Sequence, residues 1–283
     1  MVSYHTHPAQ QRDEKSAARL GLQALVIGAN NPPGGKPMGG AALYDALYAT
    51  GYHANLNTTR ALHLPVIQNL SGALGVRSVL DVGCSHGYAV SWLWRHGIKA
   101  SGLDVSSIAI AKAKAARGEE PSQCVPPCFA QGSATLLPWG DGAFDAIMST
   151  DVLEHLEADE VTPALKELTR VAGKMLVLKI ASRGDAVHSL QASKLAAHLQ
   201  AAAAAGGGVV GGDDVAVPAG SVAAGAAVAL PRNLHPTVHR PEWWAAQIVQ
   251  LGFRQHSRIP HPPRRPWMCC TTVFVRDSSR DSG

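Results

Sequence analysis

The 283-residue sequence lacks any block of like charges. Its 25 Lys and Arg and 21 Asp and Glu residues are scattered and give a net charge of +4. A net charge this small, from scattered charges, gives no support to a nucleic-acid partner. A long apolar run is also missing near the N-terminus, where the longest stretch, 22–29, is far too short to span a bilayer. We therefore expect no membrane span, and the length favours one large domain with additions.

Cysteine is scarce, and its spacing gives no support to a zinc site. Of the five cysteines, neither Cys269–Cys270 nor the pair in Cys124–Val–Pro–Pro–Cys128 is repeated as a second pair at zinc-ligand spacing. The 13 histidines are too widely spread to indicate a metal. We expect no metal site, and an intracellular, reducing compartment, most simply the cytoplasm.

Strand-like and helix-like segments alternate from residue 77 onward, a pattern typical of a parallel sheet covered by helices. One predicted helix begins at Ser106 or Ser107 and ends at Gly118, and another begins at Pro241 and ends at Gly252. The final two strands should pair antiparallel, because their connection is too short for a crossover helix. We expect strands at 78–82, 98–104, 125–130, 144–149, 174–180, 253–259 and 269–275.

Three further segments complete the predicted organisation around a domain of residues 77–275. Residues 1–76 form a helical extension, in which Tyr44, Tyr48 and Tyr52 share one helical face that is typical of a lid or of core packing. Residues 191–230, rich in alanine and glycine, are predicted to be a low-complexity insertion. Residues 276–283 are predicted to be a flexible tail.

Two phosphate-binding motifs are absent from the turn after the first strand. A dinucleotide-binding loop would need glycine where Ser85 and Tyr88 stand, and the Gly-Lys-Ser/Thr ending of a P-loop is missing. The turn does contain Gly83 and Gly87, which allow a sharp bend and a close approach of a ligand to the backbone. Ligands of open parallel sheets bind at such strand ends.

Two acidic residues indicate the character of that ligand. Asp81 lies inside the first strand end and suits a ligand with an ammonium group or a net positive charge. Asp104 closes the second strand, where a carboxylate can accept hydrogen bonds from both hydroxyls of a ribose. The simplest ligand is a cationic nucleoside.

Three segments of the chain resemble class I S-adenosylmethionine-dependent methyltransferases, and more narrowly the type 11 group that includes enzymes of quinone biosynthesis. They are "VLDVGCSHG", "GLDVS" and "GSATLLPWGDGAFDAIMSTDVLEHL". The resemblance covers about residues 77–275. It implies an α/β fold with a doubly wound, seven-stranded, mostly parallel Rossmann-like sheet that ends in an antiparallel strand pair, and S-adenosyl-L-methionine as cofactor.

The resemblance also implies roles for individual residues. Asp81 would hold the amino group of the cofactor, Asp104 the ribose, and Ser133 would lie at the adenine edge. Ser85 replaces a glycine that family members usually carry, and Ser133 replaces an aspartate. The implied cofactor-binding residues are Asp81, Gly83, Cys84, Ser85, Gly87, Asp104, Val105, Ser133, Ala134, Ser149, Thr150 and Asp151.

His155 is the candidate catalytic residue, because a neutral imidazole near the fourth strand can take a proton from a hydroxyl or an acidic carbon. A positional role for Glu154–His155 at a helix start is the alternative. His235, His239 and Trp243–Trp244 are compatible with an acceptor pocket or with a packed helix entry.

The lead hypothesis is methyl transfer to an oxygen or carbon of a small organic acceptor. A catalytically degenerate, cofactor-binding scaffold or regulator within an assembly is the first alternative, and a nicotinamide-dependent oxidoreductase is the second. RNA or protein as acceptor stays open, since four arginines near the C-terminus form a modest basic patch: Arg254, Arg258, Arg264 and Arg265. The oligomeric state is not predicted.

Overall fold

The computed structural model of the chain describes residues 40–49, 67, 72–181, 235–260 and 270–277. Helix α2 (Gly40–Ala49) belongs to one compact unit, and all elements from β1 onward belong to a second. Most of the predicted extension, the predicted insertion at 191–230 and residues 278–283 lie outside the described residues. Tyr52, Arg264 and Arg265 lie outside them as well.

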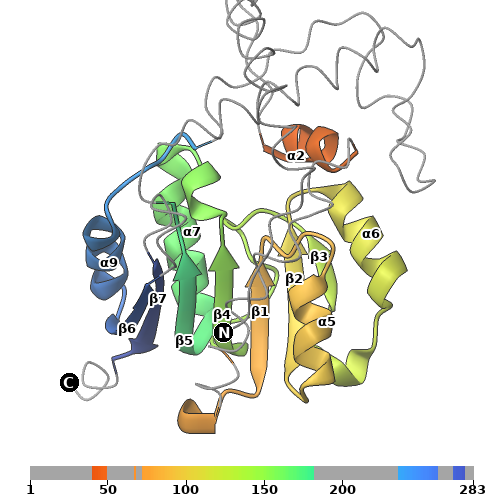
Figure 1. Cartoon of the computed structure of the whole chain (residues 1–283), viewed down its shortest axis with the longest axis horizontal. Helices are drawn as coiled ribbons and strands as arrows, with labels where there is room; N and C mark the ends of the chain where they lie inside the picture. Colours follow the sequence, from red (N-terminus) through yellow and green to blue (C-terminus); the bar gives the residue numbers. More distant parts are fainter. Residues whose placement is uncertain (1–39, 50–66, 68–71, 182–234, 261–269, 278–283) are drawn as a thin grey trace, which may run out of the picture. The chain divides into compact units, whose positions relative to one another are not determined.

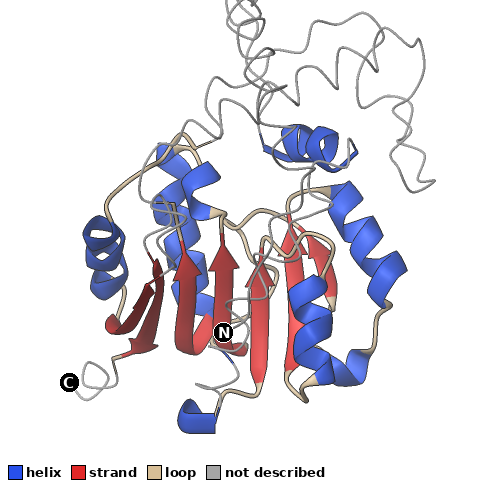
Figure 2. Ribbon diagram, in the orientation of Figure 1, coloured by secondary structure: helices blue, strands red, loops and turns tan. Residues whose placement is uncertain are grey.

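A seven-stranded sheet in the order β3-β2-β1-β4-β5-β7-β6 forms the centre of the second unit (Figures 1 and 2). The first five strands pair parallel, and β7 pairs antiparallel with both β5 and β6. The predicted α/β fold class and the antiparallel C-terminal pair are confirmed. The strands are β1 (Ser78–Val82), β2 (Lys99–Asp104), β3 (Phe129–Gln131), β4 (Phe144–Thr150), β5 (Ala172–Lys179), β6 (Phe253–Pro260) and β7 (Cys270–Arg276).

The helices begin and end at residues whose chemistry explains the boundaries. The Ser106 hydroxyl accepts the Ala109 N–H at the start of α6, and Gly118 follows its last residue, as predicted. Glu157 and Glu160 form a capping box at the start of α7. The helices are α5 (Tyr88–Arg95), α6 (Ser107–Arg117), α7 (Ala158–Val171) and α9 (Pro241–Gln250), with 3₁₀ turns η1 (Pro121–Gln123) and η2 (Leu153–His155).

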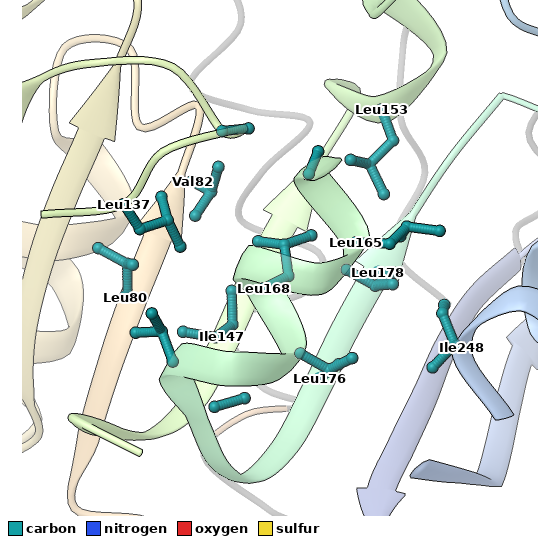
Figure 3. Close-up of a cluster of buried hydrophobic side chains, with 14 of the residues drawn as sticks. Leu80, Val82, Leu137, Ile147, Leu153, Leu165, Leu168, Leu176, Leu178 and Ile248 are labelled. Atoms are coloured by element: carbon teal, nitrogen blue, oxygen red, sulfur yellow. The ribbon is translucent and has the colours of Figure 1, made fainter. Parts of the chain in front are cut away.

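Side chains alternate between the two faces of the sheet, so each face carries its own core. Leu80 and Leu176 face a cluster that includes residues of α7 and α9 (Figure 3), whereas Val79 and Val177 face a second cluster with residues of α5 and α6. The central strands are therefore covered on both sides, which is the environment that parallel sheets require. Hydrophobic packing on both faces keeps the strand ends of the sheet in fixed positions.

The prediction of a strand at 125–130 was wrong, because β3 is only Phe129–Gln131. Pro126 and Pro127 have no N–H to donate to a neighbouring strand, so the apolar stretch before residue 129 runs as a loop. The Ser101 hydroxyl donates to the Val125 carbonyl at 2.7 Å and holds this loop against β2.

A disulfide joins Cys124 to Cys128 within the same loop, with the two Cα atoms 5.3 Å apart. The Cys124–Cys128 spacing was considered only as a possible zinc site, and the disulfide was not predicted. In the described part of the chain, no helix has the length and apolar character that crossing a membrane requires.

Candidate functional site

The turn after β1 is held in an unusual backbone conformation. Gly83, Ser85 and Gly87 have φ angles of 80°, 54° and 69°, all in the left-handed region. The N–H groups of Gly83 and Cys84 both donate to the Leu103 carbonyl, at 2.7 and 2.9 Å. The turn is therefore folded over the end of β2, and glycine relieves the strain at two of its three left-handed positions.

Space as well as conformation requires glycine in this turn. A Cβ on Gly83 would lie 2.2 Å from Cγ2 of Val152, and a Cβ on Gly87 would lie 2.7 Å from the Phe129 ring. Val152 follows β4, so the turn after β1 packs directly against the segment after β4. The paired ends of β1 and β4, where Val82 lies opposite Ser149, are thereby brought into one site.

Asp104 joins the turn after β1 to the turn after β2. Its Oδ2 accepts the Ser85 N–H at 2.8 Å, and its Oδ1 accepts the Ser106 N–H at 3.0 Å. The side chain is only 5% exposed. The carboxylate therefore lies at the carboxyl ends of two adjacent parallel strands, where ligands of open parallel sheets bind.

The other predicted residues on this side lie around Asp104. Asp81 and Cys84 are buried at the end of β1, and Gly132 N–H, next to Ser133, donates to the Asp104 carbonyl at 3.0 Å. The Ser133 hydroxyl is 2.8 Å from that of Thr135 and also accepts the Thr135 N–H, so it shapes the loop after β3. Ala134 is buried beside it, and Val105 accepts a hydrogen bond from the Gln131 side chain.

The end of β4 carries buried hydroxyl groups. Ser149 and Thr150 are each 1% exposed, and neither hydroxyl has a hydrogen-bond partner among the described residues. Buried polar groups in proteins normally have partners, and orphan groups at a strand end are typical of a ligand site. These two hydroxyls make the β4 end a candidate position for a polar ligand.

Asp151, the next residue, is paired with a cation that sequence analysis missed. The Lys179 ammonium at the end of β5 is 3% exposed and forms an ion pair with Asp151 Oδ2. Asp151 also has φ 56°, and its N–H donates to the Lys179 carbonyl at 2.9 Å. The parallel pairing of β4 with β5 places the two residues side by side, and only the sheet order, not a motif, could have indicated the pair.

Glu154 is fully buried in the 3₁₀ turn η2. Its Oε1 accepts the Ala181 N–H at 3.0 Å, whereas Oε2 has no hydrogen-bond partner among the described residues. Burial, with the nearby charge of Asp151, raises the pKa of Glu154 to about 8. The side chain thus lies at the β4 end in an environment that disfavours its charged form.

Two histidines come together beside Glu154. The rings of His155 and His235 meet edge to face with centroids 4.4 Å apart, and one ligand atom from each lies within 4.8 Å of the others and of a Glu154 oxygen. His239 is not part of this group; it stacks on Trp243 instead, at 3.7 Å. Trp244 packs into the core, so the predicted second cluster divides between a site residue, His235, and a packed helix entry.

Comparison with known proteins identifies one segment of the chain. A family model described as a methyltransferase domain, of type 11, matches residues 80–175. Ajmaline N-methyltransferase of Rauvolfia serpentina is 32% identical over 109 residues, 38% of this chain and 36% of that protein. An uncharacterized methyltransferase of Synechocystis is 33% identical over 126 residues, 44% of this chain and 52% of that protein. The matches thus span about a third to a half of these relatives' length.

Solved structures share the fold. Magnesium protoporphyrin IX methyltransferase of Synechocystis, crystallised with bound S-adenosylhomocysteine, has a TM-score of 0.51 at 16% identity, over 86% of this chain and 90% of that chain. A TehB-like protein of Corynebacterium glutamicum has a TM-score of 0.50 at 15% identity, over 81% and 98%. At these identities the likeness concerns the fold alone.

Proposed function

We propose that the protein transfers the methyl group of S-adenosylmethionine to a small organic acceptor, at an oxygen or a carbon, and the match of residues 80–175 to the type 11 methyltransferase domain supports this proposal. The observation that carries the proposal is Asp104, whose buried carboxylate is tied to the turns after β1 and β2 at the carboxyl ends of two adjacent parallel strands. A structural neighbour with bound S-adenosylhomocysteine supports the same cofactor.

The cofactor would lie over the turn after β1. Asp104 would bind its ribose hydroxyls, and the negative charge of Asp81 favours the ammonium and sulfonium groups of the methionine part. Gly83, Cys84, Ser85 and Gly87 would line the methionine part with backbone. The remaining contacts of the proposed cofactor site would be made by Val105, Ser133, Ala134, Ser149, Thr150 and Asp151.

The sulfonium is already activated, so the protein has to hold an acceptor in line with the S–CH₃ bond and exclude water. The acceptor's electron pair forms the new bond to the methyl carbon while the electrons of the S–C bond return to sulfur. S-adenosylhomocysteine and the methylated acceptor are the products. We assign the acceptor side to the β4 end, where His155 lies and where it can receive the acceptor's proton if no other group activates the acceptor.

Calorimetric titration with S-adenosylhomocysteine tests the cofactor site. We expect one equivalent to bind the wild-type chain, and Asp104→Asn to weaken binding by at least tenfold, because hydrogen bonds to a charged group contribute about 1.5–3 kcal/mol. Asp159→Asn, which changes an exposed aspartate in the first turn of α7, is the matched control and should bind like the wild type. Equal affinity of all three proteins would contradict the assignment.

Labelled S-adenosylmethionine then tests turnover and acceptor class. The proposal expects label in the small-molecule fraction of an extract. Label in RNA or in protein would contradict the proposed acceptor class. Binding without transfer to any fraction would favour the degenerate scaffold. Transfer to a nitrogen, as the name of the Rauvolfia relative states for that enzyme, would contradict only the proposed atom.

A further inference from the structure

We propose that Glu154, His155 and His235 form a binding site for one divalent transition-metal ion of the Zn²⁺ type. The three side chains offer one carboxylate oxygen and two imidazole nitrogens, all within 4.8 Å of one another. Two of the ligands come from η2 and the third from a segment 80 positions further along the chain, and β1, β4 and β5 fix the sheet edge at which they meet. No metal site was expected from the sequence, because its 13 histidines are too widely spread to indicate one.

The unsatisfied oxygen of Glu154 is an independent indication of a ligand. Its side chain has no exposed surface, Oε1 is used by the Ala181 N–H, and Oε2 has no partner among the described residues. A buried carboxylate oxygen without a partner is unfavourable unless something binds it. A cation at the cluster would satisfy it.

The required movement is small. Ligand atoms of a tetrahedral zinc ion lie about 2.0–2.2 Å from the metal, which sets them about 3.4 Å from one another. Donor atoms at most 4.8 Å apart therefore need to approach by no more than about 1.4 Å. The χ2 torsions of histidine side chains are broad, so rotation of the two imidazoles is the simplest route to such a change.

The donor set selects the kind of ion. Two imidazoles and one carboxylate suit Zn²⁺, Fe²⁺ or Ni²⁺, whereas Mg²⁺ prefers six oxygen ligands in octahedral geometry. Asp151, the nearby acidic residue, is already paired with Lys179 and is not counted among the ligands. Three protein ligands leave at least one coordination position open, the arrangement that metal ions use when they bind substrate.

This inference deepens the proposed function and rests on it for its substrate class. An acceptor at the β4 end would place a hydroxyl or enolate oxygen in the open position, so the enzyme would select acceptors with an oxygen donor at or next to the methylated atom. A bound ion would lower the pKa of a coordinated hydroxyl, whose proton would then pass to water. In this arrangement His155 is a ligand of the ion and not a base.

Zn²⁺ titration of the full chain, after dialysis against a chelator and its removal, tests the site directly. We expect one saturable site with a Kd in the micromolar range or below, and equimolar Mg²⁺ should not displace Zn²⁺. Glu154→Gln retains an oxygen for the Ala181 N–H but removes the charge, and it should weaken Zn²⁺ binding at least tenfold, as should His235→Ala. His256→Ala, which changes an exposed histidine of β6, should bind Zn²⁺ like the wild type.

Several outcomes would overturn the inference: no saturable Zn²⁺ site, displacement by Mg²⁺, or unchanged affinity in both Glu154→Gln and His235→Ala. Folding is checked by the melting temperature of the metal-free variants, and His155→Ala replaces any variant that does not fold. S-adenosylhomocysteine titrated into the same samples separates the two proposals. Zn²⁺ binding without cofactor binding refutes the proposed function alone, whereas cofactor binding and chelator-insensitive methyl transfer without Zn²⁺ binding refute the metal site alone.

Discussion

Replacement of Gly83 by alanine tests how the turn after β1 is packed. At φ 80°, an alanine is disfavoured by about 1–2 kcal/mol, as left-handed conformations are for residues with a Cβ. The new Cβ would also lie 2.2 Å from Cγ2 of Val152, a stiff β-branched side chain, and such overpacking adds about 1–3 kcal/mol. We expect Gly83→Ala to lower the free energy of unfolding by about 2–5 kcal/mol.

Two companion variants separate the conformational part from the contact. Gly97→Ala has nearly the same φ, 71°, with no atom within 4 Å of its Cβ, so only about 1–2 kcal/mol should be lost. Val152→Ala removes both Cγ atoms. In the double variant Gly83→Ala/Val152→Ala the steric part should disappear, so the combined loss should be smaller than the sum of the single losses by about 1–3 kcal/mol.

Urea denaturation followed by circular dichroism measures all four free energies of unfolding. Additive losses in the double variant would refute the contact between the turn after β1 and the segment after β4. A loss in Gly97→Ala as large as that in Gly83→Ala would lead to the same conclusion, because it would leave the left-handed conformation as the whole cause.

Two further predictions concern the loops around β3. Glu167 accepts hydrogen bonds from Arg170 and from Leu137 N–H, and the Arg170 contact lowers the pKa of the Glu167 carboxyl. Its stabilisation is present above the unfolded-state pKa and is lost as the pH falls through the lower folded-state pKa. Glu167→Gln should therefore lose about 1–2 kcal/mol in urea denaturation at pH 7 and progressively less toward pH 3, and a pH-independent loss would contradict this. Replacing Cys124 and Cys128 by serine opens a short loop and should lower the free energy of unfolding by about 2 kcal/mol relative to the oxidised wild type, but leave it equal to that of the reduced wild type.

The elements that sequence reasoning located correctly are those whose signals are local. Ser106 and Gly118 bound a helix because a hydroxyl and a left-handed glycine satisfy the groups that a helix end leaves open. The apolar 78–82 and 144–149 segments form β1 and β4 because both faces of a central parallel strand are buried. The 125–130 segment was predicted to be a strand because it is apolar. Pro126 and Pro127 prevent this, since proline has no N–H to donate to a neighbouring strand.

In the candidate site too, features with a local sequence signal could be predicted and features that depend on tertiary contacts could not. The turn from Gly83 to Gly87 and the position of Asp104 at the end of the next strand could be predicted, because a short motif specifies the backbone there. The pairing of Lys179 with Asp151 could not, since it depends on the order of β4 and β5 in the sheet. The proximity of His235 to Glu154 is a tertiary contact between segments about 80 residues apart in the sequence. No periodic pattern in the sequence predicts such a contact.

The contact between Gly83 and Val152 gives these two parts of the site a physical connection. Gly83 begins the turn on which the cofactor is proposed to lie, and Val152 stands between Asp151 and Glu154 on the proposed acceptor side. Because Val152 already touches the backbone of Gly83, a ligand that shifts the turn has to move Val152, and with it the start of η2. Cofactor occupancy should therefore change the geometry of the Glu154 cluster, so that S-adenosylhomocysteine and Zn²⁺ affect each other's affinity by the same factor, as linkage requires. Titration of each ligand in the presence and absence of the other measures that factor, and a value of one in both directions would show that the two sides act independently.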